Sequence, residues 1–268
     1  LFMLTDATTD ENVWTNVGGG TGDVQPYTFQ GTISGYSSGG YSAQATIEKN
    51  SFASDGNATS TGNLSSSRYY CTGASSKIHG YTAGGHSGNK TIDKFSFASE
   101  GDATDVGDFL AIDESPAGSN SETYGYGAGE YPATNVIEKY SFSVDGNATD
   151  VGNLSASRSG VAGISGTAYG YATGGSGVVD IVDKFSFASD GNATDICNLT
   201  SARSNAHGNS STTEGFTSGG YAAVNIIDKF SFASEADAVD HGDLSQGRGI
   251  SNGPTSTTHG YTCGGSAG

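Results

Sequence analysis

A fixed period of 45 residues runs along almost the whole chain and constrains its fold more than any other feature. A glycine followed by an aromatic residue recurs at this spacing, at Gly35, Gly80, Gly125, Gly170, Gly215 and Gly260. A strict period of this length is typical of repeat proteins, in which each unit packs on its neighbours. We therefore expect a single domain built from six repeats, at residues 24–64, 69–109, 114–154, 159–199, 204–244 and 249–265.

Each repeat has the pattern of four short antiparallel strands. In residues 159–199, the segments SGVAGISGTA, YGYATGG and VVDIVDKFSF are followed by the turn sequence SDGNAT and a short last segment, ATDICNL. No window places apolar residues at helical spacing. Four strands in a unit of about 45 residues match one propeller blade. The sequence predicts an all-β fold, a six-bladed β-propeller with four strands in each blade.

Two further columns predict how the blades pack. Side chains alternate along a strand, so Phe185 and Phe187 share one face, which can pack on the next blade. We expect the same structural role for the column Phe97, Phe142, Phe187 and Phe232. A glycine column in the first strand, at Gly73, Gly118, Gly163, Gly208 and Gly253, is expected beside the central axis, where a residue without Cβ allows close backbone approach.

The last repeat ends after two strands, which raises the question of how the ring closes. Residues 1–19 lie where a third and fourth strand should be, with LFML in register with residues 136–139. We expect these closure strands to complete the sixth blade and to remove the open sheet edge.

The charge distribution argues against two classes of partner. The net charge is −17, and nine of the eleven basic residues lie in two repeat columns and form no cluster. Nucleic acids and anionic membranes both need a concentrated cationic surface. No apolar run approaches the roughly 18 residues of a spanning helix, and LFML is too short for a signal peptide. We expect no nucleic-acid partner and no membrane insertion.

The sequence shows no clear motif for binding a metal or a cofactor. The three cysteines lack the paired spacing of a disulfide framework or a zinc motif, and we expect them to be buried filler. The loop with Asp190, Asn192, Thr194 and Asp195 is rich in oxygen but lacks the spacing of a calcium loop, so turn formation is favoured and calcium binding stays open. We expect no cofactor and no metal site.

Four arginines, Arg68, Arg158, Arg203 and Arg248, begin successive first strands. Asp105, Asp150, Asp195 and Asp240 form a column nearby in sequence, which favours structural ion pairs between blades. The alternative is an arginine cluster that grips a carboxylated sugar, although Asp23 and Asp113 replace arginine in two repeats.

The uniform length of the repeats argues against catalysis, because enzymatic propellers usually build a pocket from loop insertions. We expect no catalytic residues. Loops on a rigid frame are where binding specificity usually lies. The candidate contact residues are Tyr41, His86, Tyr131 and Tyr221, one column between the second and third strands, and the alternative is that they are ordinary rim residues.

Glycine pairs such as Gly84-Gly85, an aromatic residue about a dozen positions later and an arginine opening the next unit resemble kelch-type propellers, although the usual tryptophan of the fourth strand is missing. The phrase GYTAGG…IDKFSFASDGNATDVGNL, assembled from several repeats, resembles repeat proteins of marine bacteriophages, especially cyanophage virion proteins and tail appendages.

The phage resemblance implies a non-enzymatic virion protein, a capsid decoration or tail-fibre appendage that takes part in host attachment. Its partners would be other virion proteins and a host surface glycan or protein, and self-association stays open. Two alternatives remain: a glycan-cleaving propeller enzyme that acts on host surface polysaccharide, and a cellular kelch-like interaction scaffold.

Overall fold

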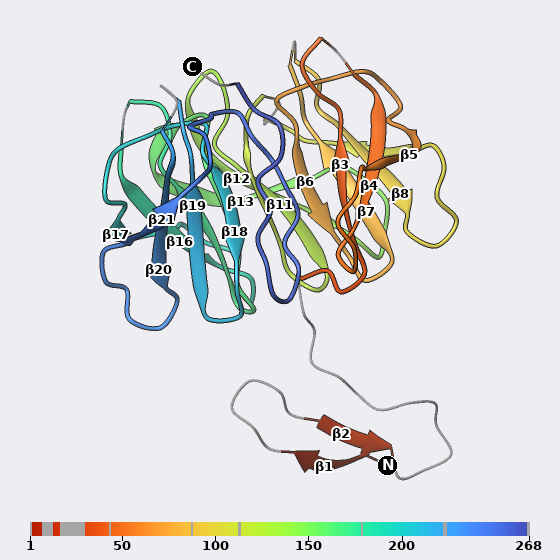
Figure 1. The fold of residues 1–268 in the computed structure, drawn as a ribbon, viewed down its shortest axis with the longest axis horizontal. Helices are drawn as coiled ribbons and strands as arrows, with labels where there is room; N and C mark the ends of the chain where they lie inside the picture. The colour runs from red at the N-terminus through yellow and green to blue at the C-terminus, as the bar shows by residue number, and fades with distance from the viewer. Residues whose placement is uncertain are drawn as a thin grey trace.

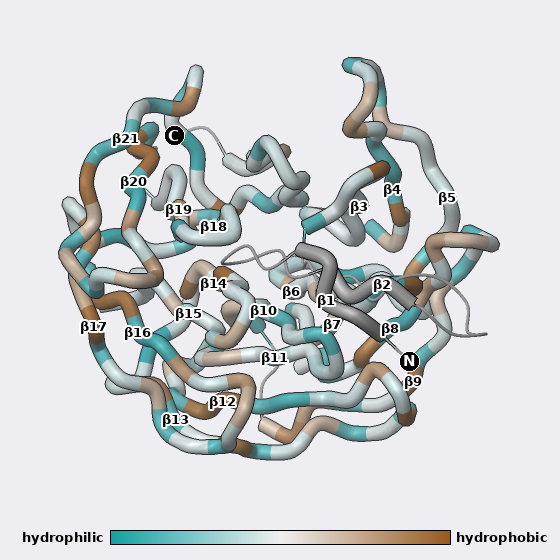
Figure 2. The backbone as a smooth tube through the Cα atoms, turned by 90° about the horizontal axis from the view of Figure 1, so that it is seen from below, coloured by the Kyte–Doolittle hydropathy of each residue, from teal (hydrophilic) through white to brown (hydrophobic). Residues whose placement is uncertain are grey.

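The fold consists of small β-sheets arranged around a central axis in a computed structural model (Figures 1 and 2). The structure describes residues 2–6, 13–16, 30–42, 44–86, 88–111, 114–177, 179–221 and 224–266. All the elements in these ranges are strands. These ranges contain no helix that is long and apolar enough to cross a membrane.

Five of the sheets are propeller blades, each an antiparallel meander. Blade 1 consists of β3 (Ser34–Ser38), β4 (Thr46–Ser51) and β5 (Thr59–Asn63). Blade 2 consists of β6 (Thr72–Ser75), β7 (His79–Ala83), β8 (Thr91–Ser96) and β9 (Thr104–Asp108). Blade 3 consists of β10 (Ala117–Asn120), β11 (Tyr124–Ala128), β12 (Thr134–Ser141) and β13 (Thr149–Arg158). Blade 4 consists of β14 (Ala162–Ser165), β15 (Tyr169–Thr173), β16 (Ile181–Ser186) and β17 (Thr194–Asn198). Blade 5 consists of β18 (His207–Ser210), β19 (Glu214–Ser218), β20 (Ile226–Ser231) and β21 (Val239–Asp243).

Side-chain packing explains why a glycine followed by an aromatic residue recurs. Gly80 of β7 lies opposite Phe95 of β8, and a Cβ on Gly80 would lie 2.3 Å from the Phe95 ring. The glycine therefore makes room for a ring that crosses the strand. The aromatic residue that follows it stacks on the phenylalanine column of the next blade, as in Tyr81–Phe142 at 4.6 Å and Tyr171–Phe232 at 4.6 Å. These stacks form the core between neighbouring blades.

Two polar contacts join the same pairs of blades. The third-strand lysine of one blade reaches an acidic residue in the turn before the last strand of the next blade, in the pairs Lys49–Glu100, Lys94–Asp145, Lys139–Asp190 and Lys184–Glu235. In the same turns, the side-chain oxygens of Asp102 and Asn192 accept hydrogen bonds from the amides of Asn63 and Asn153 at 2.9 Å and 3.1 Å. The oxygen-rich turns thus hold adjacent blades together.

In blades 3 to 5 the innermost strands lie too close together for side chains at the glycine column. A Cβ on Gly163 of β14 would lie 2.1 Å from the carbonyl oxygen of Gly118 in β10. A Cβ on Gly208 of β18 would lie 2.2 Å from the carbonyl oxygen of Gly163. Real Cβ atoms do not approach backbone this closely, so these positions require glycine.

The prediction of six blades is wrong, because the described residues form five. The last repeat forms only a short hairpin, residues 249–266, with the isolated bridges Gly249↔Ser266, Asn252↔Cys263 and Thr255↔Gly260. This C-terminal hairpin lies between blade 5 and blade 1. Asn209 of blade 5 donates to Thr255 Oγ1 at 3.0 Å, and Tyr261 stacks on Phe52 of blade 1 at 5.3 Å.

The predicted closure by residues 1–19 is also wrong for the residues that the structure describes there. β1 (Phe2–Asp6) and β2 (Val13–Asn16) pair with each other in a two-stranded sheet and with no described strand of a blade. The reason lies in their sequence. At the register predicted above, Met3 and Leu4 fall where blades 2, 4 and 5 carry an aspartate and a lysine on the third strand. These strands therefore lack the charged groups that fix a third strand in its blade.

Replacement of Gly163 by alanine should destabilise the protein by about 1–3 kcal/mol, because the new methyl group meets the backbone of Gly118. The matched control is Gly56→Ala, since a Cβ there has no atom within 4 Å, and its change should stay within about 0.5 kcal/mol. Urea denaturation of the full chain measures both. Equal stability of the two variants would contradict the crowding of the inner strands.

The buried histidine at the start of β18 should make stability pH-dependent. Burial lowers the pKa of His207 from 6.5 to about 4, and the backbone of Gly253 and Tyr261 in the C-terminal hairpin faces the ring. Between these two pKa values the unfolded chain binds a proton that the folded chain does not, so stability falls as the pH decreases from 6.5 towards 4.

The expected loss from this residue is at most about 3 kcal/mol. Denaturation curves at several pH values, for the wild-type chain and His207→Gln, measure it. The variant should lack this part of the pH dependence, and an unchanged profile would show that His207 is not its source.

Candidate binding site

Three arginines of the predicted column form buried ion pairs. Their Nη2 atoms lie at 2.7, 2.6 and 2.7 Å from an aspartate Oδ2, in the pairs Arg68–Asp93, Arg158–Asp183 and Arg203–Asp228. The side chains are about 1% exposed for arginine and 0% for aspartate. The partner is the third-strand aspartate that follows the arginine along the chain, and not the expected column at Asp105, Asp150, Asp195 and Asp240. Arg158 ends β13 of blade 3 and Asp183 lies in β16 of blade 4, so this pair joins two blades, as the sequence favoured, but through a different aspartate.

The Arg158 pair fastens strands of two adjacent blades. From the end of β13 in blade 3, Arg158 Nη2 also donates to the carbonyl of Ala172 in β15 of blade 4 at 3.1 Å, and Asp183 of β16 accepts from the amide of Ser155 in β13 at 2.9 Å. Burial lowers the pKa of the Arg158 guanidinium, while Asp183 opposes this shift. We call this arrangement the arginine–aspartate clamp. Guanidinium groups this deeply buried and paired are not available to grip a substrate.

In blade 3 the buried acid of the third strand is stabilised without an arginine. Asp113, which replaces the arginine, lies outside the described residues. The third-strand acid is Glu138, which is fully buried and accepts from the amides of Leu110 and Ala111 at 2.8 Å and 2.7 Å. The buried carboxylate is therefore stabilised by backbone donors.

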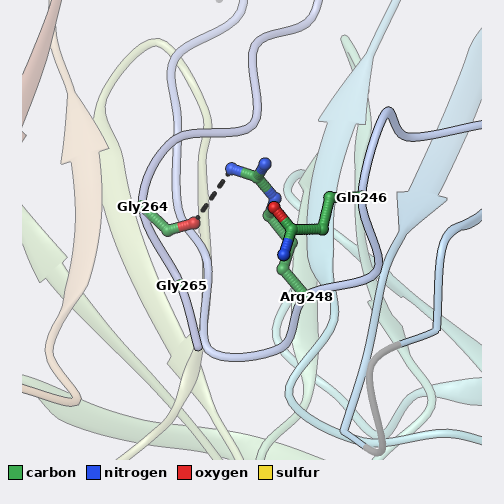
Figure 3. Close-up of a pocket in the computed structure, with 4 residues that line it drawn as sticks. All are labelled: Gln246, Arg248, Gly264 and Gly265. Atoms are coloured by element: carbon green, nitrogen blue, oxygen red, sulfur yellow. Dashed lines mark hydrogen bonds between the residues drawn. The ribbon is translucent and has the colours of Figure 1, made fainter. Parts of the chain in front are cut away.

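Arg248 differs from the other members of its column. It lines a pocket of about 180 Å³ with Gln246, Gly264 and Gly265, and its Nη1 donates to the carbonyl oxygen of Gly264 at 3.1 Å (Figure 3). No carboxylate pairs with Arg248 in the part of the chain that the structure describes. The third strand that would carry one is missing from this repeat.

The four candidate contact residues lie on the connections between second and third strands. Tyr41, Tyr131 and Tyr221 are 81%, 61% and 69% exposed, and the His86 side chain is 41% exposed. The structure brings Tyr41 and His86 together through Tyr69, whereas Tyr221 of blade 5 has no ring contact among the described residues. Tyr131 adjoins them through its amide, which donates to the Glu114 carbonyl at 2.9 Å.

Tyr69 is the centre of a cluster at the rim of blades 1 to 3. Its ring stacks on His86 at 4.4 Å and contacts Tyr41 at 5.5 Å and Tyr70 at 4.9 Å. His86 Nδ1 lies 3.1 Å from Glu114 Oε1. We call Tyr41, Tyr69, Tyr70, His86 and Glu114 the aromatic cluster. Partly exposed ring faces beside a carboxylate and an imidazole can stack on a ligand and hydrogen-bond to it.

The sequence reasoning missed Tyr69, Tyr70 and Glu114. The signal was present, because Arg68 is followed by Tyr69-Tyr70 where other repeats have Ser159-Gly160 and Ser204-Asn205. Tyr70 has a φ of 58°, in the left-handed region, and the same holds across its column, at Ser115, Gly160, Asn205 and Ile250. A bulky residue there is strained by roughly 1–2 kcal/mol. Strain of this kind is often retained where the side chain has a function.

Two other predictions concern metals and cysteines. In the described ranges, no three His, Cys, Asp or Glu side chains are grouped so that they could hold a metal ion. Cys197 is buried as expected, but Cys71 is only partly buried and Cys263 is exposed. The expectation of buried filler is therefore wrong for Cys263, because no third strand covers it.

Comparison with solved structures settles the fold. One structure, described as "Structure of YjhT", superposes with a TM-score of 0.72 at 12% sequence identity, and the match covers 88% of each chain. The chain has a β-propeller fold. At this identity the likeness extends to the fold alone. No family model and no curated protein matches the chain.

The clamp should matter for stability only where it is complete. Replacement of Arg158 by alanine should cost about 3–5 kcal/mol, because it leaves Asp183 buried without its partner. Arg248→Ala is the control from the same column and should change stability by less than about 0.5 kcal/mol. Urea denaturation distinguishes the two variants, and a mild effect of Arg158→Ala would contradict the structural role of the pair.

Proposed function

We propose that this propeller is a non-enzymatic binding module that captures a host surface glycan, and that it serves as a structural part of a phage particle. The aromatic cluster carries the proposal of binding. It gathers aromatic side chains, a histidine and a glutamate from three successive blades, and one of them, Tyr70, occupies a backbone conformation that a smaller residue would adopt with less strain.

The chemistry of the cluster favours an uncharged sugar. The rings of Tyr41 and Tyr69 can stack on the apolar face of a sugar ring, and Glu114 and His86 can bond its hydroxyl groups. A chain with a net charge of −17 repels polyanions, which disfavours strongly acidic polysaccharides. A neutral glycan is the ligand class that fits both observations.

The absence of catalysis is part of the proposal. Arg158 and Arg203, the residues that a carboxylated-sugar hydrolase would use, are buried in clamps. The place on a phage particle rests on the resemblance of the repeated phrase to marine phage virion proteins. The repeated contacts between blades suit a particle component, since they give a rigid frame that displays different loops.

A binding experiment tests the module. Glycan arrays and host-cell binding by the full chain should show at least a tenfold loss for Tyr69→Ala, because that ring contacts three others in the cluster. Tyr221→Ala, from the same repeat column as Tyr41, is the matched control and should bind like wild type. Equal binding by both variants, or release of sugar from the bound glycan, would overturn the proposal.

Tyr70 allows a sharper test. Tyr70→Gly should raise stability by about 0.5–1 kcal/mol, because glycine relieves the left-handed strain, and should weaken glycan binding. Thermal denaturation and the binding assay measure the two effects on one sample. A variant that is more stable and binds fully would show that Tyr70 does not contact the ligand.

The assignment to a particle has a separate test. Mass spectrometry of purified virions should detect the chain at a fixed ratio to the major structural proteins. Its absence from particles would overturn the virion assignment and leave the binding module to be judged by its own assay.

A further inference from the structure

The C-terminal hairpin leaves one strand edge uncovered. Cys263 is exposed, whereas the residues of its column in blades 2 to 5, Ala83, Ala128, Thr173 and Ser218, are at most 3% exposed. In the blades a third strand covers this edge. The amides of Gly84, Gly174 and Gly219 donate to carbonyls of Thr91, Ile181 and Ile226 on that strand. The amide of Gly264 has no such acceptor in the described ranges.

The pocket beside this edge repeats the surroundings of the clamp. Arg248 Nη1 donates to the Gly264 carbonyl at 3.1 Å, as Arg158 Nη1 donates to the Gly174 carbonyl at 3.1 Å. In blade 4 the same guanidinium also binds Asp183 of the third strand. Arg248 thus keeps the arginine half of the clamp at an edge where the described chain supplies no aspartate.

Two side chains of blade 5 also make contacts that differ from those of their equivalents in the preceding blades. In the four preceding blades the third-strand lysine reaches an acid of the next blade, but Lys229 of blade 5 pairs with Glu214 of its own blade. Tyr171 of blade 4 stacks on Phe232 of the following blade, whereas Phe216 of blade 5 contacts His241 of its own blade. A cation and an aromatic ring that elsewhere bind the outer strands of the next blade here make local contacts.

From these observations we propose that the edge at Gly260–Gly265 binds an extended strand donated by another polypeptide, with an aspartate that pairs with Arg248. Backbone hydrogen bonds to an open edge supply affinity, and the arginine fixes the register. The strand that fits has the pattern of this protein's own third strands, a β-branched residue followed by Asp, Lys and an aromatic residue. β1 does not have this pattern, since Met3 and Leu4 take the two charged positions.

The probe is a labelled synthetic peptide with the sequence of residues 225–244, NIIDKFSFASEADAVDHGDL, which contains the outer two strands of blade 5. The full chain should bind it in a fluorescence anisotropy titration. A peptide with the change Asp228→Asn should bind at least tenfold more weakly. Arg248→Ala should weaken binding of the original peptide to the same level and abolish the difference between the two peptides, and Arg248→Lys should restore part of it.

A disulfide trap tests the register. Ser218 of β19 pairs with Ile227 of β20, so a peptide with the change Ile227→Cys should place its thiol opposite Cys263. Oxidation should join the peptide to Cys263 and not to Cys71, as peptide mapping would show. Tyr69→Ala should bind the peptide normally, so failure of glycan binding leaves this test unaffected. No binding, no discrimination between Asp228 and its asparagine variant, or a cross-link elsewhere would overturn the proposal.

Discussion

The buried arginine–aspartate clamp is the interaction on which the packing of one blade against the next depends. Arg158, the last residue of β13 in blade 3, reaches the carbonyl of Ala172 on the second strand of blade 4 and the carboxylate of Asp183 on its third strand, and that carboxylate also accepts from the amide of Ser155 in β13. Ion pairs this deeply buried are costly to break, because either partner alone would be an uncompensated charge. The clamp therefore fixes the end of one blade against the third strand of the next, and the stacks and lysine contacts join the same pairs of blades.

The sequence revealed the blades because their packing depends on single residues at fixed positions. Gly80 and Phe95 are a crossed pair that recurs in blades 2 to 5, and Gly163 lies against the backbone of Gly118 as Gly208 lies against that of Gly163. The sequence did not reveal the number of blades, since a period says nothing about whether the ends of the chain supply the missing strands. Met3 and Leu4 occupy the positions of an aspartate and a lysine, which indicates that residues 1–19 do not have the pattern of a third strand.

The site was only partly visible in the sequence for a related reason. Tyr41 and His86 belong to one repeat column, so a search by column finds them. Tyr69 and Glu114 belong to the starts of the following repeats, and only the packing of adjacent blades brings them beside that column. The proposed binding of a glycan thus depends on contacts between repeats. The column of arginines could be found from the sequence, but Arg68, Arg158 and Arg203 form structural ion pairs and do not belong to the proposed binding site.

The account depends on a ring of five blades in which the last repeat keeps an uncovered edge beside Arg248. Hydrogen–deuterium exchange on the full chain, resolved to single amides by NMR, tests this most directly. The amides of Gly84, Gly174 and Gly219 donate to a third strand and should exchange slowly, whereas that of Gly264 should exchange nearly as fast as in an unstructured peptide. Protection of Gly264 equal to that of Gly219 in the isolated chain would show that another segment covers the edge, and would contradict the account.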